Sequence, residues 1–505
     1  PGRAHTNLRL IWWGMHTVCT GAVTSMRIGT GSRKSPGWLA SFTSLLLTIA
    51  PSLWGQSTAR LDSVNQYIRS ELTRQHIPGA SVTILRGDSV VLSQGYGWAN
   101  IELRVPASDS TIYQSGSMGK QFTAAGIMLL VGRGRLRLED RITKWLPEGK
   151  GVWDSVTIRH LLTHTAGMAE YTDSTFDYRK DYTEDQLVRF AASRPLDFVP
   201  GQRWSYSNTG YLLLGVVIHR VTGQFYGDVL RRLIFEPVRM NTTRVISEAD
   251  IIPNRAAGYQ LVRGQVKNQS WVSPSLNTTA DGALYFSVKD LARWAVALDH
   301  GPVPGKAVLD AAWAPVHLND GGTYPYGFGW DLTDQRGHRR IGHTGSWQGF
   351  KTALYRYPEY GLSIMMLTNL DQAHPGPIVQ GIAGILEPAL LPPHLIAKVL
   401  PAKAPSSLPA LLTAIAAGST LPNVTDGLRR FIAPAFRRDV GDLLQTVKSW
   451  TVLGCDHVAE GRLSRLGSPV ERICYARGIG SSARSIVAVS FTADSVATFV
   501  DWYDY

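Results

Sequence analysis

Hydrophobic positions near the start of the chain change from a helical to an extended spacing. Apolar residues at helical intervals over residues 61–72 predict a helix, and a segment containing Pro78 and Gly79 ends it. Residues 80–85 and 90–96 are rich in apolar and β-branched residues and flank a short turn at residues 86–89. Two such runs around a turn containing glycine predict a β-hairpin.

The extended spacing returns late in the chain, over residues 339–345, 350–357 and 362–367, with a turn before the last run. Between the two extended regions the pattern is mostly helical. The expected elements include a short helix and turn at residues 157–168, a helix at residues 212–221 and a helix opened by a capping-box-like Ser287. Beyond the late strands we expect a closing helix at residues 378–390.

This order of elements predicts an α/β (α+β) fold. We expect the early hairpin and the three late strands to share one antiparallel sheet flanked by helices, with the middle of the chain forming a separate helical lobe. A cleft between such lobes is where a binding site is expected.

Several prolines between residues 392 and 409 predict a linker. Beyond it, helical patterns at residues 408–418 and 425–447 precede four extended segments near residues 450–455, 471–476, 485–491 and 497–502. The sequence therefore predicts four parts: an upstream segment with a signal peptide (1–56), a main domain (57–390), a Pro-rich linker (391–408) and a small α+β accessory domain (409–505).

The net charge of +12 is unevenly distributed. Residues 1–56 contain five basic residues and no acidic one, so the remainder of the chain carries +7 without any basic run. A nucleic-acid partner or a membrane-surface role is therefore disfavoured. The hydrophobic content of 44% and charged content of 18% are typical of a globular protein.

The first 56 residues resemble an export signal. From the expected start at Met26, basic residues precede an apolar run at residues 38–50, and cleavage is expected near Gly55 and Gln56. The alternative is an uncleaved membrane anchor, although the run is short for a bilayer span. We expect an exported protein, periplasmic or extracellular, with no stable membrane span after cleavage.

The cysteines and histidines give no sign of a metal site. Cys455 and Cys474 are the pair left after the leader, and they form either a disulfide or two reduced buried thiols. His160 and His164 have the i, i+4 spacing that can bind zinc, but no third ligand accompanies them, so we interpret them as structural. We expect no metal and no cofactor.

A Ser-x-x-Lys motif at Ser117 and Lys120 provides candidate chemistry. It lies where an extended segment at Ile112 and Tyr113 turns into a helix, and residues three apart share a helix face. A serine hydroxyl becomes a nucleophile when a neighbouring base takes its proton, and a partly desolvated lysine is such a base. Alone, the motif is expected about once by chance in a chain of this composition.

Two further motifs follow in order. Tyr206-Ser207-Asn208 offers a phenol for general acid or base work and an amide for the lysine or the substrate. His343-Thr344-Gly345-Ser346 lies on a predicted late strand, where a glycine permits close approach of a substrate backbone. The backbone N–H groups of Ser117 and Ser346 are the candidate oxyanion hole.

These three motifs, in this order, resemble the penicillin-recognising serine hydrolases, in particular the class C β-lactamase-like branch, over about residues 58–390. That branch includes D-alanyl-D-alanine carboxypeptidases, D-aminopeptidases and esterases. The resemblance implies that Ser117 is the acylated nucleophile and that Lys120 and Tyr206 are the acid/base pair. It also implies that Asn208, His343, Thr344 and Gly345 bind the substrate.

One departure from the family pattern bears on the substrate. β-Lactamases usually have lysine at the position of His343, and histidine is only partly charged near neutrality. We therefore expect a small amide or ester substrate, such as a D-amino-acid peptide, ahead of a β-lactam. The alternatives are β-lactamase activity and a cell-wall peptide-binding or sensing module without turnover, and the oligomeric state is open. Tyr113, Trp204 and Trp347 either line the cleft or belong to the core.

Overall fold

The computed structural model describes residues 50–172, 175–270, 272–274, 278–392, 395, 403–417, 419–432, 447–458, 464, 468–480 and 485–504. The expected start at Met26 and the apolar run up to residue 49 lie outside the described residues, as do parts of the expected linker and residues 433–446 of the second predicted tail helix. No helix in the described part of the chain is long and apolar enough to cross a membrane.

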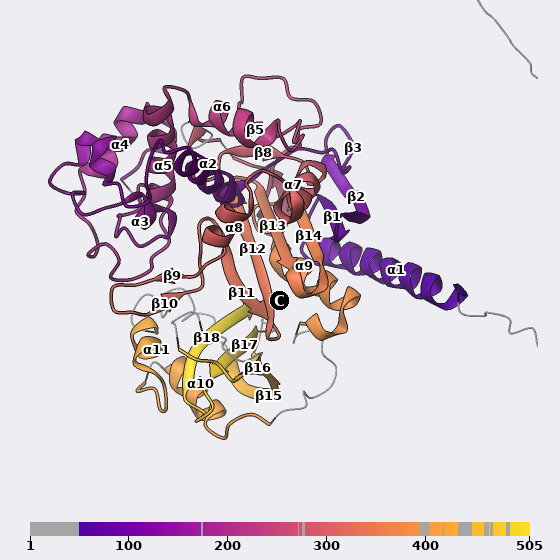
Figure 1. Cartoon of the computed structure of the whole chain (residues 1–505). Helices are drawn as coiled ribbons and strands as arrows, with labels where there is room; N and C mark the ends of the chain where they lie inside the picture. Colours follow the sequence, from indigo (N-terminus) through magenta and orange to yellow (C-terminus); the bar gives the residue numbers. More distant parts are fainter. Residues whose placement is uncertain are drawn as a thin grey trace, which may run out of the picture. The chain divides into compact units, whose positions relative to one another are not determined.

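The centre of the fold is a seven-stranded antiparallel sheet (Figure 1). The strands, in their order across the sheet, are β11 (Asp331–Gln335), β12 (His338–Trp347), β13 (Phe350–Tyr357), β14 (Leu362–Thr368), β1 (Gly79–Arg86), β2 (Ser89–Asn100) and β3 (Val105–Pro106). Strand β1 pairs with β14 from Ala80 opposite Thr368 to Arg86 opposite Leu362. The prediction that the early hairpin and the late strands share one sheet is confirmed.

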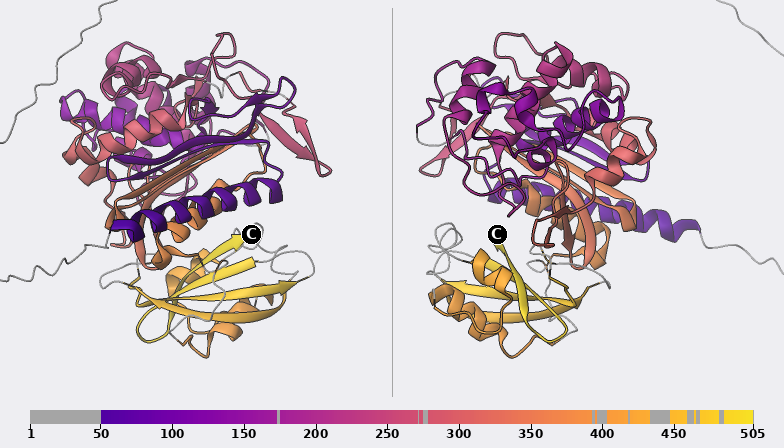
Figure 2. Two further views of the ribbon diagram at one scale, coloured as in Figure 1. Left: turned by 90° about the vertical axis from the view of Figure 1, so that its right-hand side faces the viewer. Right: turned by 60° about the vertical axis from the view of Figure 1, so that its left-hand side comes forward.

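Both faces of this sheet are covered, as the two views in Figure 2 show. On β14, Ile364 and Met366 pack with helices α1 (Ala50–Arg74) and α9 (Pro375–Leu386). The alternate residues Met365 and Leu367 pack on the other face, with helices α2 (Lys120–Gly132) and α7 (Val288–His300). Successive side chains of a strand point to opposite faces, so a strand covered on both sides is buried along its whole length.

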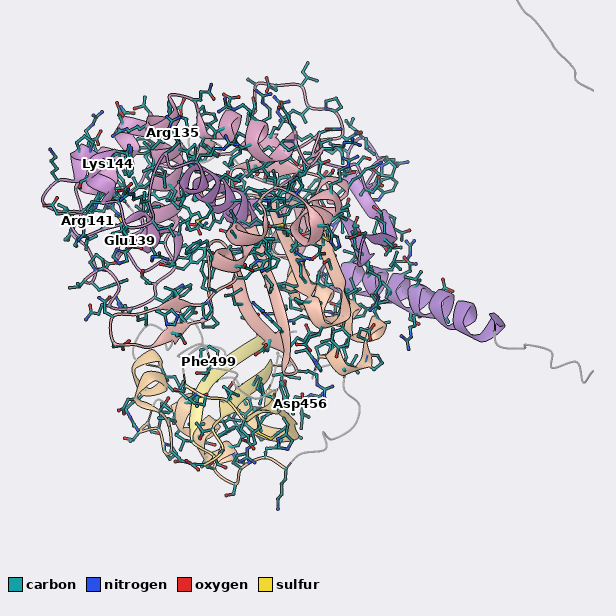
Figure 3. All side chains as sticks on the ribbon, viewed as in Figure 1. Arg135, Glu139, Arg141, Lys144, Asp456 and Phe499 are labelled. Carbon is teal, nitrogen blue, oxygen red and sulfur yellow. A yellow bond between two sulfur atoms is a disulfide. The ribbon has the colours of Figure 1, made fainter. Side chains whose placement is uncertain are left out.

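The helical lobe lies beside the α2 face of the sheet (Figures 1 and 2). Its helices are α3 (Ile158–Leu162), α4 (Glu184–Ala192), α5 (Asn208–Thr222), α6 (Tyr226–Leu230) and α8 (Lys306–Ala312). The short strands are β4 (Tyr113–Gln114), β5 (Arg244–Val245), β6 (Tyr259–Val262), β7 (Gln265–Asn268), β8 (Leu284–Phe286), β9 (Val316–His317) and β10 (Thr323–Tyr324). Charged side chains such as Arg135, Glu139, Arg141 and Lys144 lie on the outside of this lobe (Figure 3).

Three elements differ from the sequence-based expectation. Helix α1 begins at Ala50 and runs through the expected cleavage point near Gly55, because Pro51 is tolerated in a first helical turn. Strand β11 was not predicted, because it is a polar edge strand whose five residues are mostly half-buried. The closing helix is α9 followed by a separate 3₁₀ turn, Pro388–Leu390.

The C-terminal segment has the predicted α+β composition. Helices α10 (Leu408–Ala417) and α11 (Asp426–Phe431) accompany a four-stranded antiparallel sheet. We call this the C-terminal sheet; its strands are β15 (Val447–His457), β16 (Arg472–Gly480), β17 (Ser485–Phe491) and β18 (Ala497–Asp504). Cys455 and Cys474 are opposite one another on β15 and β16 and form a disulfide, while Phe499 on β18 is buried (Figure 3).

Candidate active site

Ser117 lies in a 3₁₀ turn between β4 and α2. This turn, Gly116–Gly119, precedes the α-helix, so Ser117 is placed just before the first turn of α2 instead of within it. Gly116 has φ of +55°, and a β-carbon there would lie 2.4 Å from the backbone nitrogen of Ser346. Only glycine satisfies both conditions, which brings the Ser117 turn directly against strand β12.

The Lys120 side chain is fully buried and reaches Ser117. Its Nζ donates to Ser117 Oγ at 3.0 Å, to Asn208 Oδ1 at 2.8 Å and to the Asp281 carbonyl oxygen at 2.6 Å. Burial lowers the pKa of Lys120 from 10.5 to about 8, against the opposing charges of Asp281 and Glu170.

The three contacts determine where a neutral amine would accept a proton. An ammonium has three donors and no acceptor, and all three donors are used here. Amide and carbonyl oxygens accept only, whereas a hydroxyl also donates. Once Lys120 is deprotonated, its lone pair therefore has Ser117 as its one donating neighbour among these three. The arrangement is that of a general base and its serine.

Asn208 is held in place by a carboxylate that sequence reasoning missed. Its backbone nitrogen donates to Glu170 Oε1 at 2.6 Å and its Nδ2 donates to Glu170 Oε2 at 3.1 Å. With Nδ2 facing Glu170, Oδ1 faces Lys120, so the carboxylate determines the orientation of the amide. Burial raises the pKa of Glu170, opposed by its hydrogen bonds from Ser207 and Asn208. Glu170 belongs to an irregular loop, and no spacing in the sequence marks it.

Tyr206 lies beside the same pair. Its hydroxyl is buried and has no hydrogen-bond partner of good geometry among the described residues, although the nearby Ser117 side chain lowers its pKa somewhat. Burial dominates and raises the pKa of Tyr206 well above its usual value. The Lys120 Nζ lies 4.9 Å from the centre of the Tyr206 ring. A neutral phenol next to the serine is suited to pass a proton, and less suited to remove one as phenolate.

The two histidines considered for zinc have structural partners. His160 Nδ1 accepts from the backbone N–H of Thr157 and completes the cap of α3. His164 Nδ1 accepts from the Ser207 backbone, and its ring lies 4.3 Å from the Tyr206 ring. Burial lowers the pKa of His164 well below its usual value. No group of three metal-ligating side chains occurs within the ranges described.

Strand β12 brings Ser346 next to Ser117. Its pairing with β11 ends at Gly342, so the following residues have no β11 partner on that side. A β-carbon on Gly345 would lie 2.0 Å from the Ser115 carbonyl oxygen, which also accepts from Thr352 Oγ1 at 2.7 Å. The backbones around Ser117 and Ser346 are therefore adjacent, as two oxyanion-binding N–H groups require. Thr344 on this strand is exposed.

His343 is buried and differs from a cationic substrate ligand. Its Nδ1 bonds with the Thr344 carbonyl oxygen, so that nitrogen carries the proton, and its Nε2 then accepts from the Tyr326 hydroxyl at 3.1 Å. Burial lowers the pKa of His343. Both ring nitrogens are used within the protein, and the ring is neutral near pH 7.

A pocket of about 560 Å³ opens next to Ser117. Its walls come from the loop after α3, the β6–β7 hairpin, the β12–β13 turn and the segment around Asp281. The lining residues are Ser117, Tyr171, Thr172, Tyr178, Asn208, Gln260, Gln269, Ser270, Asp281, Ser346, Trp347, Gln348, Gly349 and Asp371. Of the three aromatic residues considered earlier, Trp347 lines the pocket, Tyr113 is in the core and Trp204 stacks on Tyr324.

Comparisons with known proteins identify the family of this chain. The model of the Beta-lactamase family matches residues 64–383. Penicillin-binding protein 4* of Bacillus subtilis is 32% identical over 327 residues, which are 61% of this chain and 71% of that protein. The chain belongs to the β-lactamase family of penicillin-recognising serine hydrolases, and it is a serine hydrolase.

Solved structures show the same fold. The octameric penicillin-binding protein homologue from Pyrococcus abyssi is similar with a TM-score of 0.59 and 23% identity, over 88% of this chain and 90% of that one. A D-stereospecific amidohydrolase from a Streptomyces species has a TM-score of 0.54 and 26% identity, over 63% of this chain and 97% of the other.

Proposed function

We propose that the protein hydrolyses a small amide or ester through an acyl-enzyme on Ser117. The observation that carries this proposal is the buried Lys120, whose amine lies 3.0 Å from the Ser117 hydroxyl and has a pKa lowered to about 8. A buried amine with this pKa is partly neutral near physiological pH, and burying a lysine without such a role is costly.

In the acylation step, Ser117 Oγ attacks the substrate carbonyl carbon and its proton passes to Lys120. The N–H groups of Ser117 and Ser346 stabilise the oxyanion of the tetrahedral intermediate. As that intermediate collapses, the bond to the leaving amine or alcohol breaks, and Tyr206 delivers a proton to the leaving group, with Lys120 as its source. Water then attacks the ester by the reverse sequence and releases the acid and free Ser117.

A D-amino-acid amide, peptide or ester is the substrate class that we propose. One similar structure is a D-stereospecific amidohydrolase, and another relative is a penicillin-binding protein. The neutral, fully bonded His343 supports an amide or ester ahead of a β-lactam, because it supplies no cation for a substrate carboxylate. Export by the segment from Met26 to about residue 56 is part of the proposal, and N-terminal sequencing of secreted protein tests it.

Labelling followed by mass spectrometry tests the nucleophile. A fluorophosphonate or a penicillin should add to Ser117, and Ser117→Ala should lose both the adduct and turnover of p-nitrophenyl acetate. Tyr206→Phe should label but turn over slowly. Full activity of Ser117→Ala would remove the proposal. A stable adduct without any turnover of ester, nitrocefin or D-Ala-D-Ala peptide would instead favour a cell-wall peptide-binding module.

A further inference from the structure

An acidic side chain lies in the substrate pocket immediately beside the nucleophile. Asp281 precedes Gly282, where a β-carbon would lie 2.8 Å from the Gly116 carbonyl carbon and 3.2 Å from the Ser117 nitrogen. The Asp281 carbonyl oxygen accepts from Lys120. The Asp281 backbone is thus in contact with the machinery of the reaction, and its carboxylate is held by other contacts.

That carboxylate is buried and incompletely bonded. Asp281 is 5% exposed, and its Oδ2 accepts from the Tyr171 hydroxyl at 3.1 Å. Its Oδ1 is buried and finds no hydrogen-bond partner in any described residue. None of the ion pairs within the described ranges includes Asp281. Burying a carboxylate oxygen without a hydrogen bond is unfavourable, so such a group is expected to have a partner that the free protein lacks.

The charged residues that line the pocket indicate the sign of the charge on that partner. The charged residues among those lining the pocket are Asp281 and Asp371, and no lysine, arginine or histidine is among the described lining residues. Asp371 already pairs with Lys351, whose Nζ lies 3.5 Å from its Oδ1. Asp281 forms no ion pair among the described residues and lies next to Ser117, and the cation on which its charge acts is Lys120, which does not line the pocket.

We propose that Asp281 binds the ammonium group of the acyl part of the substrate. The substrate class is then an amide or ester of an amino acid or peptide whose N-terminal amine is free. This inference rests on the proposed Ser117 chemistry and narrows it. A substrate whose amine is acetylated loses the charge, and one with a carboxylate near this position is repelled by Asp281.

Tyr171 supports the geometry of the carboxylate. Burial first, and then the charge of Asp281, raise the pKa of Tyr171 well above its usual value, so it stays a phenol and donates to Oδ2. Because Oδ2 is held in this way, Oδ1, which is covered in the free protein, is the carboxylate oxygen left to bind the ammonium group. A charge-assisted hydrogen bond in such a site is stronger than a neutral one.

A matched pair of substrates tests the inference. D-Phenylalanine p-nitroanilide carries the ammonium group, and its N-acetyl derivative does not. We expect kcat/KM of the intact protein to favour the free amine by roughly tenfold or more, as one buried charged hydrogen bond implies. In Asp281→Asn, which keeps an oxygen for Tyr171, the ratio should fall to about one. Asp371→Asn is the matched control and should keep the preference.

Two measurements separate the possible failures. Fluorophosphonate labelling of Ser117 tests the proposed function and needs no substrate amine. If the parent protein were not labelled, that function itself would be refuted. If labelling and p-nitrophenyl acetate turnover occur but the N-acetyl compound is preferred, the ammonium site is refuted. The same holds if the preference survives in Asp281→Asn or disappears in Asp371→Asn. When neither anilide is cleaved, their inhibition constants against p-nitrophenyl acetate give the same comparison.

Discussion

At the scale of single residues, the buried Lys120 amine makes the rate of acylation depend on pH. The amine must be neutral to accept the Ser117 proton, and its pKa is lowered to about 8. The labelling rate of Ser117 should therefore rise from pH 6 and level off above an apparent pKa of about 8. Stopped-flow or quenched labelling between pH 6 and pH 10 measures this profile.

Lys120→Met should reduce the labelling rate by roughly 10²- to 10⁴-fold, the range for loss of a general base. Lys144→Met, at an exposed lysine on the outside of the helical lobe, is the control and should label at the parent rate. A flat pH profile in the parent protein would contradict the assignment of Lys120 as the base.

Glu170 acts on Lys120 through Asn208. In Glu170→Gln one of the two acceptors for Asn208 becomes a donor, so the amide turns or loses a bond, and we expect a roughly tenfold fall in kcat. The negative charge of Glu170 raises the pKa of Lys120, so its removal should move the acid limb of the profile to lower pH. If kcat fell but the acid limb of the pH profile stayed at the same pH, Glu170 would have only a structural role.

The residues that sequence reasoning could and could not predict differ in their spacing along the chain. Ser117 and Lys120 were recognisable because a helical turn brings them together, and Asn208 because it belongs to an ordered motif. Glu170 and Asp281 lie in irregular segments, and their contacts with Asn208 and Lys120 are made across long stretches of chain. Contacts between residues so far apart in the sequence leave no periodic pattern of residue types, so only the folded structure shows them.

At the scale of elements, the contact between the Ser117 turn and β12 depends on the absence of a side chain at Gly345. A β-carbon there would lie 2.0 Å from the Ser115 carbonyl oxygen and 2.4 Å from Thr352 Oγ1. Gly345→Ala should therefore separate the two N–H groups and lower kcat for p-nitrophenyl acetate by roughly 10²-fold, the cost of losing one oxyanion donor.

Gly132→Ala is the matched control for this change. Gly132 closes helix α2, and a β-carbon there meets nothing within 4 Å, so the variant should keep the parent kcat and unfold at the same or a slightly higher temperature. Equal kcat values for the two variants would show that β12 adapts to the extra carbon.

Strands that are rich in apolar residues and buried on both faces were predicted correctly, and elements held by other forces were not. Residues 350–357 and 362–367 correspond to β13 and β14, whose side chains are almost entirely buried. Strand β11 is polar and joins the edge of the sheet by backbone pairing, for which composition gives no signal. The 3₁₀ turn at Ser117 follows from packing against β12, which also lies beyond any local pattern.

At the scale of the whole molecule, the C-terminal sheet contains a cross-link that we expect to be separable from activity. The disulfide between Cys455 and Cys474 closes a loop with a sequence separation of 19. A loop of this length contributes about 3 kcal/mol by restricting the unfolded chain. Dithiothreitol should therefore lower the unfolding free energy of the C-terminal sheet by about that amount, as amide exchange on β15 and β16 can measure.

A double variant, Cys455→Ser with Cys474→Ser, should lose the response to dithiothreitol while Ser117 labelling continues. Arg336, in the turn between β11 and β12, pairs with Asp456 on β15, so the C-terminal sheet does contact the hairpin that carries Ser346. If the double variant lost Ser117 labelling, the C-terminal segment would be required for catalysis. Our interpretation of it as an accessory domain would then be wrong.

The pairing of β1 with β14 has a consequence for how the nascent chain folds. The central strands of the sheet come from opposite ends of the catalytic segment, with Ala80 opposite Thr368. Contacts of such high sequence separation form slowly, because loop closure precedes any gain from pairing. A ribosome-bound chain that stops before β14 should stay sensitive to protease, whereas one extending past α9 should resist it. Such delayed closure leaves the early hairpin without its sheet partner until the last strand of the catalytic segment has been synthesised.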